Sequence, residues 1–141
     1  MPNYARNGRT VDFRRGSGKR NVMIFSYLQV ALGGAIGAVL RYFVGSSVAF
    51  PFGTLTVNVV GSFLMGVIFV LMVDKGAERW APLMMAGVLG GFTTFSAFSL
   101  DAYRLYEAGR VTAAGGYVLA SVILSIGALA LGIIITRAAQ I

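Results

Sequence analysis

Residues 111–136, VTAAGGYVLASVILSIGALALGIIIT, form a run of 26 residues without a charged side chain. A helix needs about 20 apolar residues to cross the roughly 30 Å hydrocarbon core of a bilayer. A helix that is apolar on all sides is either buried in a large protein or spans a membrane. In a chain of only 141 residues, this run predicts a transmembrane helix.

Three more runs of the same kind precede it. Residues 80–100 and 52–73 contain no charge, and residues 24–40 contain a single polar amide, Gln29. We therefore predict an all-α integral membrane protein with four transmembrane helices. The expected helices are at about 24–46, 52–73, 80–104 and 111–137. A cleaved signal peptide would explain only one of the four runs.

The composition agrees with a membrane protein and limits the chemistry. Hydrophobic residues make up 57% of the chain and charged residues 12%, whereas a soluble domain has about 25% charged residues. Cysteine and histidine are absent from the sequence, which excludes disulfides, thiolate chemistry and the commonest transition-metal ligands. An enzyme is the least expected class, because the sequence offers no nucleophile–base pair or metal cluster.

Half of the twelve basic residues lie in the first twenty positions, and the net charge is +7. We expect residues 1–22 to form a disordered basic tail, a dispensable extension ahead of a membrane domain at 23–141 that starts naturally at Met23. Such a tail is typical of a topology signal or an anionic-lipid contact, so no nucleic-acid partner is expected. The six basic residues are Arg6, Arg9, Arg14, Arg15, Lys19 and Arg20.

The basic residues also predict an orientation. Four helices place both termini and the middle loop on one side, where nine basic residues would face two on the other. The positive-inside rule then puts the N-terminus in the cytoplasm. Without the tail the count is three against two, a near-balance that would let the chain insert both ways round.

Two pairs of glycines predict helix packing. Gly33 and Gly37 in the first run, and Gly87 and Gly91 in the third, have the GxxxG spacing. This spacing allows two helix backbones to approach closely in a membrane.

Polar residues at membrane depth are the candidates for function, because polarity is costly there. Asn58 lies seven residues into the second run, where its amide needs a partner on another helix or in a watered path. Ser121 and Ser125 are one turn apart on the fourth helix, unless they simply bond back to preceding carbonyls. Arg41 follows the first run and could equally be a snorkelling end-residue.

The segment 90–99, GGFTTFSAFS, predicts a helix broken at mid-span, because glycine, β-branched and hydroxyl residues have weak helix propensity. A break frees backbone carbonyls, which protein, water or an ion must satisfy. The carbonyls from Gly90 to Thr94 could hold a small monovalent cation, and the hydroxyls could donate to an anion. The positive ring edges of Phe95 and Phe98 could line an anion path, although such a pair is often core or lipid-facing.

Two motifs together, FGTLTVNVVG at 52–61 and GGFTTFSAFS at 90–99, resemble the Fluc (CrcB) family of fluoride channels. A glycine-rich first helix that ends in Leu40-Arg41-Tyr42 adds to the likeness, which covers about residues 24–137. The resemblance implies an antiparallel, dual-topology homodimer with two fluoride pathways in a bacterial inner (plasma) membrane. It also implies passive export of fluoride from the cytoplasm and so fluoride resistance.

The resemblance further implies roles for individual residues. Phe95 and Phe98 would be the ring pair of the pore, and Asn58 the amide that orients it and contacts the ion. Ser121 and Ser125 would be pore-facing hydroxyls of the fourth helix. The implied fluoride pathway comprises Phe95, Phe98, Asn58, Ser121, Ser125, Thr94 and Ser96.

The resemblance also implies a structural sodium ion at the dimer centre. The backbone carbonyls of Gly90 and Thr93 would form half of its site, and Arg41 matches the family's helix-1 arginine. Two positions depart from the family pattern. Ala97 stands where the family commonly has threonine, which predicts slower conduction, and Asp101 stands where it usually has glutamate.

Two other classes remain open. A small four-helix proton-coupled multidrug transporter needs a carboxylate within a span, commonly the first, and the first span here offers only Gln29 and Arg41. A non-conducting accessory subunit would explain the small residues, but neither Asn58 nor the broken segment.

Overall fold

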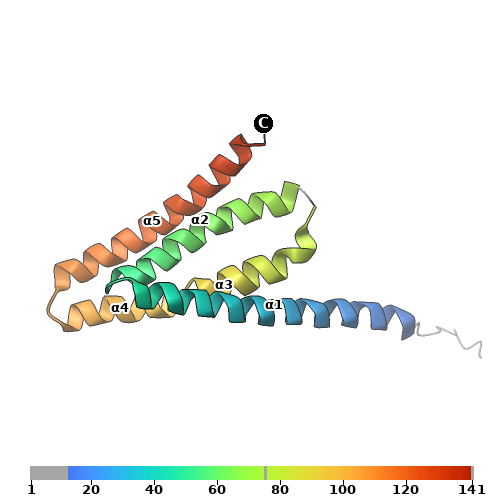
Figure 1. Ribbon diagram of the computed structural model, residues 1–141, viewed down its shortest axis with the longest axis horizontal. Coiled ribbons are helices and arrows are strands. Elements are labelled where there is room, and N and C mark those ends of the chain that lie inside the picture. Colours follow the sequence, from blue (N-terminus) through green and yellow to red (C-terminus); the bar gives the residue numbers. More distant parts are fainter. Residues whose placement is uncertain (1–12, 75, 141) are drawn as a thin grey trace, which may run out of the picture.

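The computed structural model describes residues 13–74 and 76–140, with side chains from residue 22 onward. Within that part of the chain, all regular elements are helices. The elements are α1 (Phe13–Ser47), α2 (Phe52–Asp74), η1 (Glu78–Trp80), η2 (Pro82–Leu89), α3 (Gly90–Phe92), α4 (Phe95–Glu107) and α5 (Val111–Ala138) (Figure 1).

Four stretches of these helices are long and apolar enough to cross a membrane, which confirms the predicted multi-pass all-α architecture. They are Val22–Ser47, Phe52–Asp74, Glu78–Glu107 and Val111–Ala138. The third stretch combines a short 3-10 turn, the π-helix η2 and two α-helical pieces, where the sequence suggested one helix from about residue 80 with a break.

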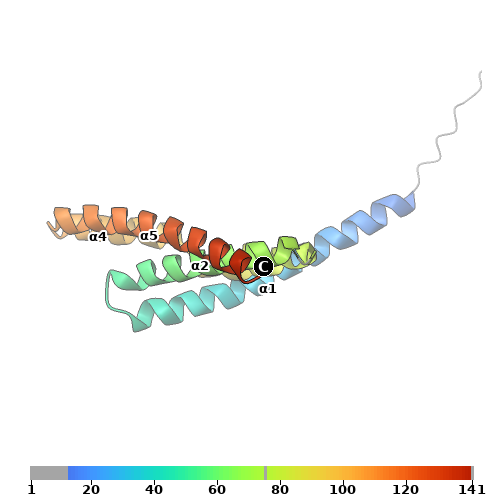
Figure 2. The ribbon, with the colours of Figure 1, turned by 90° about the horizontal axis from the view of Figure 1, so that it is seen from above.

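The N-terminal boundary differs from the expected one. The basic tail was expected to extend through residue 22, but α1 begins at Phe13, and residues 1–12 lie outside the described residues. Extending an existing helix adds a hydrogen bond for every residue fixed, whereas starting a new helix is costly. The apolar part of α1 therefore provides a nucleus from which helix continues into the basic segment. Figure 2 shows this part of α1 projecting beyond the other helices.

The first helix packs against the third span through facing glycines. A methyl group at Gly33 would overlap the carbonyl oxygen of Leu83, and one at Gly37 would overlap that of Val88. A methyl group at Gly91 would lie 2.6 Å from the carbonyl oxygen of Gly34. The close backbone approach predicted from the GxxxG spacing is thus confirmed.

The second helix packs along the fifth in the same manner, and the two lie side by side in both ribbon views (Figures 1 and 2). A methyl group at Gly66 would overlap the Leu129 carbonyl oxygen, and one at Gly132 would overlap that of Phe63. A buried cluster links α4 to α5 and consists of Phe98, Leu105, Ala114 and Tyr117. On the other side of the break, α3 packs against α1.

Candidate functional site

The third span breaks at Thr93 and Thr94, whose backbones are extended (ψ of 157° and 123°) between helices α3 and α4. The Thr93 N–H and hydroxyl both donate to the Leu89 carbonyl at 2.9 Å. The Thr94 hydroxyl accepts from the Ala97 N–H at 3.2 Å and so caps α4. Each threonine thus completes the helix on its own side, as threonine does at helix ends.

Asn58 on α2 satisfies the extended backbone at the break. Its Nδ2 donates to the Thr94 carbonyl at 3.0 Å, and its Oδ1 accepts from the Thr94 N–H at 2.8 Å. An amide offers a donor and an acceptor side by side, so it pairs with a peptide group as a neighbouring strand would. This contact satisfies both the side-chain amide and the exposed backbone at membrane depth.

Three aromatic rings follow the break. The Phe95 and Phe98 centroids are 5.3 Å apart with the rings tilted by 49°, and Phe98 stacks on Tyr117 of α5 at 5.7 Å. Phe98 is buried, whereas 78% of Phe95 is exposed on the single chain. The two phenylalanines therefore have different surroundings, although they belong to one motif.

A cavity of about 670 Å³ lies beside the break, between α2, the third span and α5. Eight of the residues singled out from the sequence line it. They are Asn58, Gly90, Thr93, Thr94, Phe95, Phe98, Ser121 and Ser125. The remaining lining residues are small, apolar or hydroxyl-bearing, so none of the described residues in the cavity wall carries a charged side chain.

Ser96 and Arg41 lie elsewhere. Ser96 is exposed, with its hydroxyl 3.1 Å from that of Thr94, and it does not line the first cavity. Arg41 lines a second cavity of about 500 Å³, and Thr94 lines both cavities. Its Nη1 donates to the Thr93 carbonyl at 3.3 Å, so the guanidinium fastens α1 to the break.

The carbonyls expected to hold sodium fit such an ion by type. Unwound backbone carbonyls are common ligands of sodium in membrane proteins. The Thr94 N–H, which would bond to Gly90 in a continuous helix, pairs with Asn58 instead, and this leaves the Gly90 carbonyl available. The Thr93 carbonyl accepts from Arg41 but has a second lone pair. Two oxygens make only part of a coordination shell, so a sodium ion bound here would need further ligands.

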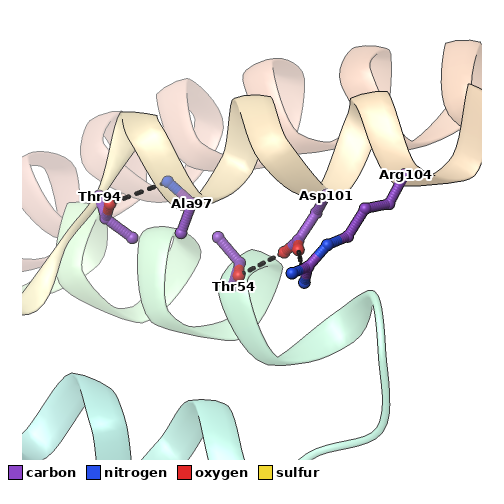
Figure 3. Close-up of polar contacts among 5 residues, drawn as sticks. All are labelled: Thr54, Thr94, Ala97, Asp101 and Arg104. Atoms are coloured by element: carbon purple, nitrogen blue, oxygen red, sulfur yellow. Dashed lines mark hydrogen bonds and ion pairs between the residues drawn. The ribbon is translucent and has the colours of Figure 1, made fainter.

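Tyr117 was not identified as a candidate from the sequence, and Asp101 was assigned no role. Tyr117 stacks on Phe98. It lies four residues before Ser121 and eight before Ser125, a spacing that would have placed it on the same face of α5. Asp101 was noted only as a departure. It is buried, and its Oδ2 accepts from the Thr54 hydroxyl at 2.6 Å (Figure 3).

Comparison with known proteins identifies the family. The model of the family described as "CrcB-like protein, Camphor Resistance (CrcB)" matches residues 28–133. The chain belongs to the CrcB family. Its curated CrcB relatives include proteins from Cereibacter sphaeroides, 58% identical over 121 residues, and Paracoccus denitrificans, 46% identical over 120 residues. Each alignment covers 82% of this chain and 97% of the relative, and both relatives are named "Fluoride-specific ion channel FluC".

Proposed function

We propose that this chain forms a fluoride-selective channel that lets fluoride leave the cytoplasm passively and so confers fluoride resistance. The observation that carries the proposal is the uncharged cavity beside the break, with the Phe95 and Phe98 rings and the Ser121 and Ser125 side chains in its wall. Fluoride is small and strongly hydrated, so neutral donors must replace its water in steps. Ring edges and hydroxyls supply such donors without a fixed cation that would trap the ion.

The names of the relatives support fluoride as the ion that passes through the channel. The family match covers most of the membrane-spanning part of the chain. The two relatives named as fluoride channels align with the chain over almost their entire length. Asn58 has both amide atoms engaged by Thr94. The second N–H of Nδ2 is not used by that pair, so in this proposal Asn58 holds Phe95 and Phe98 in place and also donates to the ion in the cavity that it lines.

The working unit of the proposal is an antiparallel homodimer with a sodium ion at its centre. Phe95 is 78% exposed on the single chain, although the proposal requires it in a pathway, so a second copy would enclose it. The Gly90 and Thr93 carbonyls would supply half of the sodium ligands, and the second copy would supply the same pair. The sodium ion would fix the two copies at their breaks, and no step of fluoride movement is assigned to it.

The test is fluoride efflux from liposomes that contain the purified full-length chain, with sodium present and chloride as the control anion. We expect rapid fluoride release and no chloride release. Release of both ions would contradict selectivity. Release of neither ion, from vesicles in which crosslinking shows an assembled dimer, would overturn the channel proposal.

A further inference from the structure

Helix α4 carries functional side chains at intervals of three residues. Phe95, Phe98, Asp101 and Arg104 follow one another from the break toward the C-terminal end of the helix. Residues three apart lie on neighbouring positions of one helix face. Phe98 and Asp101 therefore share the buried face of α4, whereas Arg104, nine residues after Phe95, lies on the opposite side of the helix from that ring.

Asp101 places a carboxylate about one helical turn beyond Phe98, on the same buried face of α4. The residue is buried, and the Thr54 hydroxyl donates to Oδ2 at 2.6 Å, which fixes the carboxylate between α2 and α4 (Figure 3). A fixed anion next to the proposed pathway repels fluoride, and the repulsion is stronger near a low-dielectric wall than in water. The carboxylate therefore requires compensation if an anion is to pass.

Arg104 is positioned to provide that compensation. Its Nη1 lies 4.0 Å from Oδ1 of Asp101, and its side chain is 58% exposed while that of Asp101 is 12% exposed. Figure 3 shows the guanidinium next to the carboxylate, and its larger exposure puts it on the outer side of Asp101. Thr54, which holds the Asp101 carboxylate, lines the second cavity beside the break, so the ion pair lies one contact away from that cavity.

We propose that Arg104 is a positioning residue for anion entry, which acts by neutralising Asp101 at the end of the fluoride pathway. This inference rests on the proposed channel function. An ordinary surface ion pair would affect folding only slightly and would not change how strongly the channel attracts fluoride. The two roles are distinguished by the dependence of flux on fluoride concentration.

The test measures initial fluoride efflux against fluoride concentration at low ionic strength for the wild type, Arg104→Gln and Arg104→Lys. We expect Arg104→Gln to raise the half-saturating fluoride concentration by about fivefold, the upper end for an exposed pair, and to leave the maximal rate unchanged. Arg104→Lys should restore the wild-type value. A fall in maximal rate alone would indicate fewer active channels and would overturn the proposal.

Arg110→Gln is the matched control, since it removes an equal charge from the exposed turn after α4. We expect it to leave the half-saturating concentration unchanged, and an effect equal to that of Arg104→Gln would reduce the proposal to general surface charge. At about 1 M salt, where the screening length is about 3 Å, the Arg104→Gln defect should disappear. A defect that persists at high salt would also overturn the inference, whereas a wild type that moves no fluoride would overturn the channel function itself.

Discussion

Asn58 binds the Thr94 peptide at both of its polar groups, with hydrogen bonds of 2.8 Å from the N–H and 3.0 Å to the carbonyl. The two residues are 36 positions apart in sequence and belong to different spans. Thr94 is the last residue before α4, so this contact sets where that helix begins. The position of the Phe95 and Phe98 rings follows from it.

Replacing Asn58 with alanine should destabilise the protein and abolish fluoride flux. The change leaves the Thr94 N–H and carbonyl without a hydrogen-bond partner, and each unpaired group lowers stability by about 1–3 kcal/mol. Thermal unfolding in detergent and liposome efflux would measure the two effects. Ser47→Ala is a suitable control, because it removes an exposed hydroxyl that bonds only to the Phe43 carbonyl within its own helix. Equal unfolding temperatures for the two variants would contradict the role given to Asn58.

Alanine at the two phenylalanines should separate folding from conduction. Phe98→Ala removes a ring that is buried within one chain and should lower stability by about 3–5 kcal/mol, whereas Phe95 is 78% exposed on the single chain, so Phe95→Ala should cost less stability than Phe98→Ala. Both changes should reduce fluoride flux, because both rings line the cavity. Unfolding and efflux measured on the same preparations would check this. If Phe95→Ala showed wild-type fluoride flux, the assignment of the Phe95 ring to the pathway would be wrong.

Adjacent glycines in α1 offer a matched test of the helix packing. Gly33→Ala places a methyl group on the Leu83 carbonyl oxygen, while a methyl group at Gly34 meets no atom within 4 Å. We expect Gly33→Ala to destabilise the protein by about 1–3 kcal/mol and Gly34→Ala to be nearly neutral for unfolding of the chain. The comparison requires only thermal unfolding. Similar losses in both variants would mean that the face of Gly34 is also in close contact.

Threonine at position 97 tests whether the second cavity belongs to the pathway. Ala97 lines that cavity together with Arg41 and Thr94. One hydrogen bond to the ion contributes about 0.5–1.5 kcal/mol, so Ala97→Thr should speed efflux by about two- to tenfold. Ala97→Val, which has the same shape but no hydroxyl, should not. Equal rates for the two variants would assign any gain to shape rather than to the hydroxyl.

The sequence predicted the four spans because hydrocarbon thickness and the absence of charge are one-dimensional signals. It also predicted the break in the third span, since the glycine and threonine residues there disfavour a continuous helix locally. The extension of α1 back to Phe13 was not predicted. The composition of residues 13–22 indicates only what that segment would do by itself. Its helix instead continues from the neighbouring apolar segment, because extending a helix is easier than starting one.

The candidate site was predicted as a set of residues but not as a set of contacts. A buried amide such as Asn58 requires a partner, yet no rule in the sequence identifies the Thr94 backbone as that partner. Ser96 lies in the same motif as Thr94 but remains exposed outside the first cavity. The pairing of Thr54 with Asp101 depends on how α2 and α4 pack, and so it emerges only in three dimensions.

The break at Thr93 and Thr94 also has an electrostatic consequence for the centre of the membrane. A helix carries about half a positive charge at its N-terminus and half a negative charge at its C-terminus. In an unbroken span these partial charges cancel along its length, but here the carbonyl end of α3 and the amide end of α4 are separated by two extended residues. The third span therefore has a partial negative charge before Thr93 and a partial positive charge after Thr94. Oppositely charged ions can be favoured a few residues apart there without an ionisable side chain in the cavity wall.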